Sequence, residues 1–155
     1  GGAGAPGGAG AGGAGAGGAG SSSVDPQAVR RVVLCSGKVA YDAMARRDAL
    51  QEEGSAPTTA VVRVEQLHPW PEEQVAAVLA RYERADDVIW LQEEPENMGP
   101  WSFVHGRLHR VLRSDFRLSH VSRAQSGSPA TGSTAVHALE TEDLLARALA
   151  PAPGS

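Results

Sequence analysis

The chain has 155 residues, with 14 Lys and Arg against 18 Asp and Glu, and a formal net charge of −4. This charge gives no general attraction to nucleic acid, no apolar run approaches the roughly 18 residues of a membrane span, and one cysteine allows no internal disulfide. We therefore expect a protein without nucleic-acid or membrane partners, located in the reducing cytoplasm.

The glycines are distributed unevenly. Twelve of the 19 lie in the first 20 residues, among alanines and a single proline. Such a segment cannot bury enough apolar surface to offset the entropy lost on ordering. We predict a disordered Gly/Ala/Ser-rich linker at residues 1–23, a folded domain at residues 24–150 and a disordered tail at residues 151–155. Because the sequence starts without Met, we also expect it to be a fragment.

Four short apolar runs alternate with four helix-like segments along the domain. The runs are continuous, which is typical of strands that are covered on both faces. Their order, β-α-β-α-β-α-β-α, predicts an α/β fold with a mostly parallel sheet, right-handed crossovers and helices on both faces. The strands are expected at residues 31–35, 60–64, 88–91 and 117–122. The helices are expected at residues 39–53, 71–82, 101–112 and 141–150.

Local signals predict where two of these helices begin. Pro71 suits the first helical position, and Glu72 and Glu73 would lie in the first turn, where carboxylates are favourable. Thr141 is the expected N-cap of the last helix, which Pro151 ends.

Polar residues follow the first predicted strand, at the sheet edge where open α/β folds bind ligands. Ser36, Gly37 and Lys38 open a helix there, so free backbone N–H groups, the helix dipole and an ammonium would converge on one point. That combination suits a phosphate or a carboxylate. The alternative is that Ser36 caps the helix while Lys38 points to water, and a lone Ser-Gly-Lys does not decide between the two.

A second polar segment follows the third predicted strand and reads Q-E-E-P-x-N-x-G-x-W from Gln92. Glu93 and Glu94 would point to opposite faces of a continuing strand, so they do not form an acid/base pair. The segment is either a solvated strand end or a loop that holds a defined shape.

Other reactive side chains point to structural roles. His105 and His109 share a helix face but have no third metal ligand near them, so packing or solvation is favoured over a metal site. Cys35 lies in an apolar run and is expected to be a buried thiol. The arginines of residues 107–117 lack interleaved aromatic residues, which favours a solvated face over nucleic-acid binding.

Four motifs in order resemble one known family. They are V-R-R-V-V-L-C-S-G-K at residues 29–38, V-R-V-E-Q-L-H-P-W-P at residues 62–71, Q-E-E-P-E-N-M-G-P-W at residues 92–101 and S-R-A-Q-S-G-S-P-A-T-G-S-T-A-V-H at residues 122–137. Across about residues 28–149 the chain resembles the C-terminal domain of the thiamine-diphosphate-dependent 2-oxoglutarate dehydrogenase decarboxylating subunit. The resemblance is greatest to the actinobacterial multifunctional type.

The resemblance implies a three-layer α/β sandwich of the transketolase C-terminal type and a non-catalytic, dimerisation or regulatory role. In that family thiamine diphosphate and magnesium are held by earlier domains, so we expect this chain alone to bind neither and to be inactive. Expected partners are a second copy, the remaining domains and other subunits of the dehydrogenase complex. The resemblance also implies an acetyl-CoA or anion effector site on Ser36, Lys38, Gln92 and Arg123.

Two other functions remain open on the sequence alone. The chain could be a free-standing acyl-CoA or nucleotide-phosphate binding module without an enzymatic role, or a remnant with no function of its own.

Overall fold

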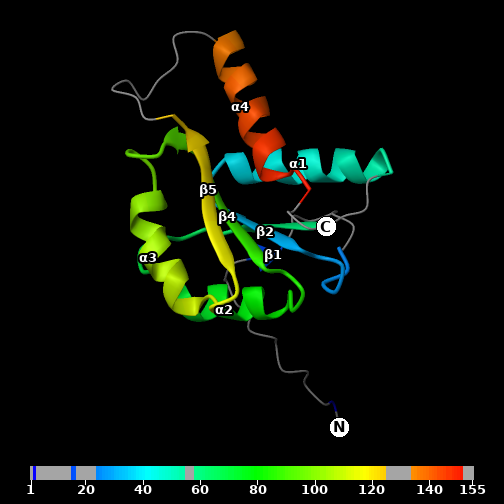
Figure 1. Cartoon of the computed structure of the whole chain (residues 1–155), viewed down its shortest axis with the longest axis vertical. Coiled ribbons are helices and arrows are strands. Elements are labelled where there is room, and N and C mark those ends of the chain that lie inside the picture. Colours follow the sequence, from blue (N-terminus) through cyan, green and yellow to red (C-terminus); the bar gives the residue numbers. More distant parts are fainter. Residues whose placement is uncertain (1, 3–14, 17–23, 55–57, 125–133, 152–155) are drawn as a thin grey trace.

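The computed structural model describes residues 2, 15–16, 24–54, 58–124 and 134–151 (Figure 1). The linker predicted at residues 1–23 lies outside the described residues, except for Gly2 and the two-residue strand β1 (Gly15–Ala16). Of the tail predicted at residues 151–155, only Pro151 is described.

Four parallel strands form the sheet, as the alternation of elements predicts. They are β2 (Arg31–Cys35), β3 (Thr59–Arg63), β4 (Asp87–Pro95) and β5 (Arg117–Arg123), in the spatial order β3-β2-β4-β5. β1 adds an antiparallel edge next to β3. Leu34 of β2 is in register with Val62 of β3 on one side and with Trp90 of β4 on the other. β5 is therefore the edge strand on the opposite side of the sheet from β1.

Helices cover both faces of the sheet (Figure 1). α1 (Val39–Glu52) and α4 (Thr134–Ala148) lie on one face, and α2 (Glu72–Ala80) and α3 (Trp101–Val111) lie on the other. This is the three-layer α/β arrangement that the family resemblance implies. Among the described residues, no helix is both long and apolar enough to cross a membrane.

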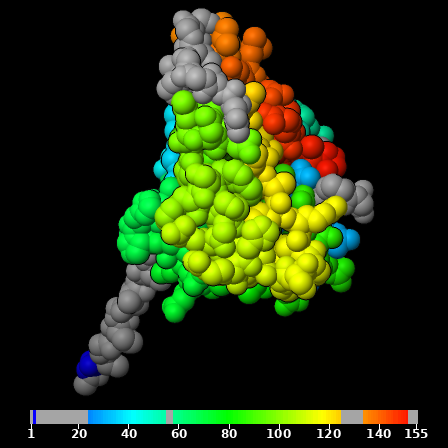
Figure 2. Space-filling model, turned by 60° about the vertical axis from the view of Figure 1, so that its left-hand side comes forward, coloured from blue at the N-terminus to red at the C-terminus, as the bar shows by residue number. Residues whose placement is uncertain are grey.

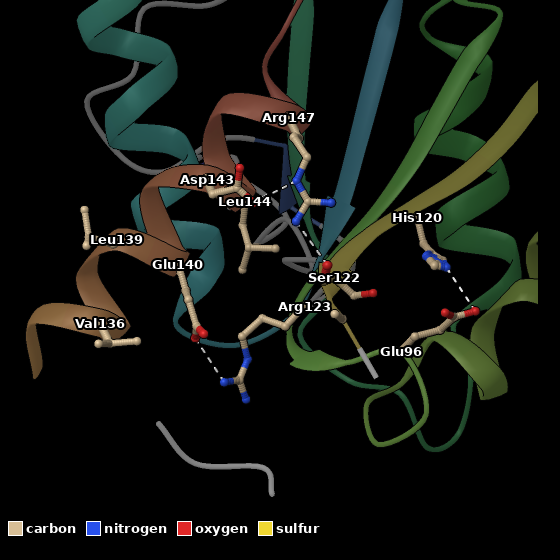
Figure 3. A pocket seen from close by; sticks show the side chains of 11 residues that line it. Glu96, His120, Ser122, Arg123, Val136, Leu139, Glu140, Asp143, Leu144 and Arg147 are labelled. Atoms are coloured by element: carbon tan, nitrogen blue, oxygen red, sulfur yellow. Dashed lines mark hydrogen bonds and ion pairs between the residues drawn. The ribbon is translucent and has the colours of Figure 1, made fainter. Parts of the chain in front are cut away.

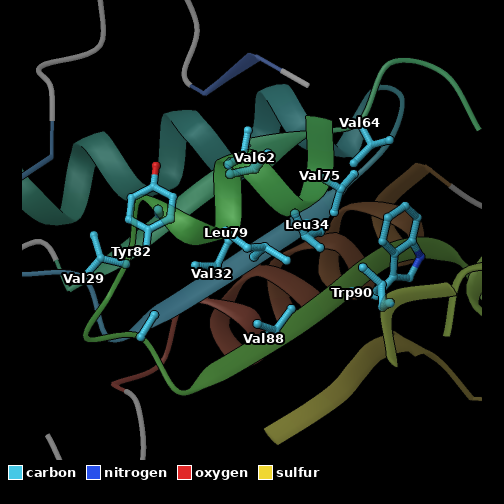
Figure 4. Close-up of a cluster of buried hydrophobic side chains, with 14 of the residues drawn as sticks. Val29, Val32, Leu34, Val62, Val64, Val75, Leu79, Tyr82, Val88 and Trp90 are labelled. Atoms are coloured by element: carbon cyan, nitrogen blue, oxygen red, sulfur yellow. The ribbon is translucent and has the colours of Figure 1, made fainter. Parts of the chain in front are cut away.

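Alternate residues of each strand enter one of two cores, because successive strand side chains point to opposite faces. Val32 and Leu34 join the cluster under α2 and α3, which Figure 4 shows, whereas Val33 and Cys35 join the cluster under α1 and α4. A strand whose side chains pack into a core on each face must be apolar at every position, which explains why the apolar runs in the sequence are continuous.

A buried ion pair joins the amino ends of the two central strands. Arg31 and Asp87 are in register, their side chains are each 7% exposed, and Arg31 Nε donates to Asp87 Oδ2 at 2.6 Å. The Arg31 Nη1 group also donates to the carbonyl oxygens of Ala148 and Ala150, at 3.3 and 2.6 Å. One guanidinium therefore fixes the carboxyl end of α4 against the amino end of the sheet.

Several boundaries differ from those predicted, and three of the differences are informative. α4 begins at Thr134, so Thr141 lies inside the helix, and its Oγ1 donates to the carbonyl of His137 at 3.0 Å. The reason is that the first two turns are exposed and carry no buried stripe, the signal on which the prediction relied. α2 begins one residue after Pro71, whose carbonyl accepts the N–H of Val75 at 2.9 Å. β4 continues four residues beyond its apolar run, to Pro95.

The thiol of Cys35 has the structural role predicted for it. The side chain is fully buried, and its Sγ lies 3.9 Å from the carbonyl oxygen of Val62. Burial raises the pKa of this thiol to about 12, although the nearby charge of Arg63 acts in the opposite direction. A thiol in this state is a poor nucleophile.

Candidate functional site at the carboxyl edge of the sheet

The helix after β2 begins without a side-chain cap. Lys38 occupies the N-cap position of α1, and Ser36 does not cap the helix as one alternative required. Ser36 is half-buried, Gly37 and Lys38 are exposed, and Gly37 has φ +77°, a conformation that favours glycine. No side chain caps the first turn of α1, in which the N–H groups of Ala40 and Tyr41 donate to the carbonyl oxygens of Gly37 and Lys38, at 3.2 and 3.0 Å. The positive end of the helix dipole there lies beside an exposed ammonium.

Gln92 is 2% exposed and belongs to the interior of the domain. Its Oε1 accepts hydrogen bonds from Trp90 Nε1 at 3.1 Å and from the backbone N–H of Trp101 at 2.9 Å. Its Nε2 donates to the carbonyl oxygens of Glu94 and Pro95, at 3.2 and 3.0 Å. The Q-E-E-P segment is thus a defined structure organised by one amide, and its interpretation as a solvated strand end is wrong.

A close contact between Gly99 and Gln92 completes this arrangement. A Cβ on Gly99 would lie 2.5 Å from Gln92 Nε2, so only glycine leaves room for the amide. Gln92 also accepts from the first residue of α3, so it joins the end of β4 to the start of that helix. The amide is fully engaged by the chain itself.

Arg123, at the end of β5, contributes to a different region. Its Nε donates to the carbonyl of Glu93 at 2.7 Å, and its Nη1 pairs with Glu140 Oε2 at 3.1 Å. Figure 3 shows the pair crossing from β5 to α4 beside a cavity of about 580 Å³. Eleven residues line that cavity: Glu96, His120, Ser122, Arg123, Ala124, Val136, Leu139, Glu140, Asp143, Leu144 and Arg147.

The charges that line this cavity alternate in sign. Arg147 donates to Asp143 Oδ2 at 3.0 Å and to the carbonyl of Ser122 at 3.1 Å, as Arg123 does to Glu140 and Glu93. Each of the two guanidinium groups is thus paired with a carboxylate of α4. The described lining has no positive cluster of the kind that a polyphosphate requires.

His120 has an unusual environment beside the same cavity. Its Nε2 lies 3.4 Å from Glu96 Oε1, whereas its Nδ1 is buried without a hydrogen-bond partner among the described residues. Burial lowers the pKa of His120; Glu96 opposes this shift, and Arg147 adds to it. The imidazole therefore favours the neutral form.

The four predicted site residues all lie at the carboxyl edge of the sheet, in different surroundings. Ser36 and Lys38 follow β2, the side chain of Gln92 is enclosed by its own chain, and Arg123 ends β5 and pairs with Glu140 of α4. The cavity beside Arg123 was missed from the sequence because its walls come from the end of β4, from β5 and from α4, and no local pattern links them.

The family resemblance implies magnesium for the full enzyme. Among the described residues, however, no group of three or more His, Cys, Asp or Glu side chains could hold a metal ion. His105 instead lies against Trp101, with ring centroids 5.4 Å apart and Nδ1 3.3 Å from the Trp101 carbonyl.

Comparison with known proteins gives this architecture a family. The family model of the 2-oxoglutarate dehydrogenase C-terminal region matches residues 18–149. The chain belongs to this family. Its similarity to curated members is about as strong across bacteria and animals, and three examples show the range.

The chain is 41% identical over 125 residues to the 2-oxoglutarate dehydrogenase E1 component of Coxiella burnetii, which covers 81% of the chain and 13% of that protein. It is 42% identical over 126 residues to the protein of the same name from Azotobacter vinelandii, and this match covers 79% of the chain and 13% of that protein. It is also 42% identical over 128 residues to the 2-oxoadipate dehydrogenase complex component E1 of Xenopus laevis. This match covers 83% of the chain and 13% of that protein. The chain thus spans about an eighth of the length of these relatives.

These matches support the interpretation of the chain as the C-terminal domain of a dehydrogenase E1 component, and they give no support to a free-standing binding module. They do not single out the actinobacterial type, which stays a prediction.

Proposed function

We propose that this 2-oxoglutarate dehydrogenase C-terminal domain works as the non-catalytic C-terminal part of an E1 component that oxidatively decarboxylates 2-oxoglutarate in the tricarboxylic acid cycle. The observation that carries the proposal is the continuous family match over residues 18–149. Thiamine diphosphate and magnesium would be held by other domains of that enzyme. A second E1 copy and the other subunits of the dehydrogenase complex would be its partners.

The geometry of the carboxyl edge supports a structural role for this domain within such an enzyme. The amide of Gln92 is saturated by the chain, and the guanidinium of Arg123 is held by a carbonyl and a carboxylate. Neither side chain can contact a substrate without giving up one of these hydrogen bonds. The described edge thus resembles a rigid support more than a reaction centre.

A chimeric enzyme tests this proposal. The matched region of the Azotobacter vinelandii E1 component would be replaced by the aligned residues of this chain, and turnover of 2-oxoglutarate would be measured with thiamine diphosphate and magnesium. We expect turnover by the chimera and none by this chain alone. Turnover by the chain alone, or a folded chimera without activity, would contradict the proposal. A chimera that prefers 2-oxoadipate would instead change the assigned substrate.

We further propose that the start of α1 binds the anionic part of acetyl-CoA, a regulatory ligand. The uncapped first turn and the exposed ammonium of Lys38 support this assignment, and Ser36 lies beside them. Gln92 would act only indirectly, by holding the neighbouring loop, and Arg123 would need to leave Glu140 before it could reach a ligand.

Calorimetric titration with acetyl-CoA tests the effector site. We expect Lys38→Ala to weaken binding about tenfold, consistent with the loss of one charge-assisted contact, whereas Arg46→Ala, on an exposed position further along α1, should leave it unchanged. Equal binding by the wild type and Lys38→Ala would remove the site from the start of α1.

A further inference from the structure

The two halves of α4 are held in different ways. Leu144, Leu145 and Ala148, in the carboxyl half, are buried in the core cluster that they share with α1. Residues 134–139 are all exposed, and Glu140 is half-buried. In Figure 1 and in Figure 2 the amino half, in orange, projects at the top of the molecule, whereas the red carboxyl end lies against the body of the domain. The hydrophobic core therefore fixes only the carboxyl half of the helix.

Polar contacts also anchor the carboxyl half. Arg31 donates to the carbonyl oxygens of Ala148 and Ala150, at 3.3 and 2.6 Å, and Arg147 donates to the carbonyl of Ser122 at 3.1 Å. None of these three hydrogen bonds involves the amino half. Exposed helix ends without buried contacts open at little cost in free energy. The first turns of α4 can therefore move while the rest of the helix stays in place.

An ion pair at the boundary between the two halves joins α4 to β5. Glu140 Oε2 lies 3.1 Å from Arg123 Nη1, and the two side chains are 36% and 16% exposed. The same guanidinium donates through Nε to the carbonyl of Glu93 at 2.7 Å, so it keeps its position when Glu140 leaves. Partly exposed ion pairs contribute little net stability, which makes this pair exchangeable. Arg123 is thus a preorganised anion-binding group that a carboxylate of the chain itself occupies.

The charge of the neighbouring cavity shows what Glu140 does there. Arg123 and Glu140 both line this space of about 580 Å³, a volume within the range of small-molecule sites. Its described lining carries two arginines and three carboxylates, one of which is Glu140, so an anion is repelled. Once Glu140 has left, the charges balance and one guanidinium is open to carboxylate or phosphate oxygens, which guanidinium groups bind strongly. Glu140 therefore controls whether the cavity accepts an anion.

We propose that Glu140 is an autoinhibitory contact, which holds Arg123 in the free domain and is displaced by an anionic group of the effector. The displacement releases the amino half of α4, residues 134–140, while the carboxyl half stays docked. This inference rests on the acetyl-CoA binding put forward under Proposed function. Because the two anions compete for one guanidinium, whatever weakens the ion pair strengthens effector binding, and effector binding in turn frees the helix.

The isosteric variant Glu140→Gln tests the contact in this chain. It removes the charge and keeps the size and the helix propensity of the side chain. Glu142→Gln is the matched control, because it removes an exposed carboxylate two residues further along α4 and leaves the ion pair in place. Acetyl-CoA affinity would be measured by calorimetry, and hydrogen exchange of the α4 amides would be followed with and without acetyl-CoA.

We expect Glu140→Gln to bind acetyl-CoA about threefold more tightly, in line with the loss of one partly exposed ion pair. Exchange at residues 134–140 should speed up in this variant without ligand, and in the wild type when acetyl-CoA is added. Exchange at residues 144–148 should not change in either case. Glu142→Gln should behave as the wild type, and the gain in affinity should disappear when Arg123→Gln is added to Glu140→Gln.

Equal affinities of the wild type and Glu140→Gln would overturn this inference, and the effector site would stand if Lys38→Ala still weakened binding. A gain that persists without Arg123, or slower exchange at residues 134–140 with acetyl-CoA bound, would also overturn it. Absence of acetyl-CoA binding to every variant would overturn the effector site and this inference together. The role of the domain within an E1 component is tested separately, by the chimera.

Discussion

Each end of β4 holds a buried polar side chain, Asp87 at the amino end and Gln92 near the carboxyl end, and the two are stabilised by different chemistry. At the amino end Asp87 forms an ion pair with Arg31, and the end of α4 closes over it. At the carboxyl end Gln92 satisfies an indole, a backbone N–H and two carbonyls with a neutral amide. The charged end joins three elements of the core, whereas the neutral end shapes a loop that remains on the surface.

The amino end of β4 therefore contributes mainly to the stability of the core, whereas the carboxyl end positions a surface loop. A buried charge is costly unless its partner is present, so the amino end resists any rearrangement. An amide exchanges hydrogen bonds at a smaller cost, so the carboxyl end can carry a surface segment with exposed residues such as Met98. Four predictions test this comparison, from the largest expected effect to the smallest.

Removing the carboxylate at the amino end should have the largest effect. Asp87→Ala leaves the guanidinium of Arg31 buried without its counter-charge, and we expect the free energy of unfolding to fall by about 3–5 kcal/mol in urea denaturation. Asp115→Ala breaks an exposed ion pair with Arg113 and should cost about 0–1 kcal/mol. Equal effects of the two substitutions would show that the buried pair is not special.

Gly99→Ala tests the carboxyl end. The added methyl group would overlap the amide of Gln92, so we expect a loss of about 1–3 kcal/mol of unfolding free energy. Gly106→Ala is the matched control: it meets open space inside α3 and should stabilise the domain by about 1 kcal/mol. The cost of Gly99→Ala should shrink in a Gln92→Ala background, and an undiminished cost would mean that the strain lies elsewhere.

The pH dependence of stability should report on His120. Its pKa in the folded chain lies below the ordinary value of 6.5, so the unfolded chain takes up a proton first as the pH falls. The contribution of His120 to stability is therefore complete above about pH 6.5 and is lost as the pH falls through the folded-state pKa.

Unfolding free energies at pH 7.5 and pH 5.0, both within the range where histidine titrates, would measure this effect. His120→Phe keeps a ring beside Trp101 and should flatten the pH dependence, whereas the same substitution at the exposed His137 should leave it in place. An unchanged slope in His120→Phe would place the titrating group elsewhere.

The smallest effect is expected at Cys35, next to the carboxyl end of β2. Because burial raises the pKa of its thiol to about 12, we expect almost no alkylation by iodoacetamide at pH 8 in the folded protein and full alkylation in urea. Mass spectrometry would follow the reaction. Rapid labelling of the folded chain would mean that this end of the sheet opens readily.

The family resemblance and the order of the elements were both readable from the sequence. Continuous apolar runs predict strands that are covered twice, and their alternation with helices predicts the parallel sheet that the structure shows. The exposed start of α4 was missed because a helix that buries no face has no periodic signal over those turns.

The sequence by itself thus determined the class of fold and the family, because strand and helix patterns are local and the four motifs lie within short segments. Only the tertiary structure decided the roles of individual polar residues. Arg31 and Asp87 lie 56 residues apart and meet solely through strand register, and Gln92 becomes an internal support only because α3 begins directly above it. Whether a polar side chain meets a ligand or its own chain depends on neighbours that folding brings together, and local sequence does not encode those neighbours.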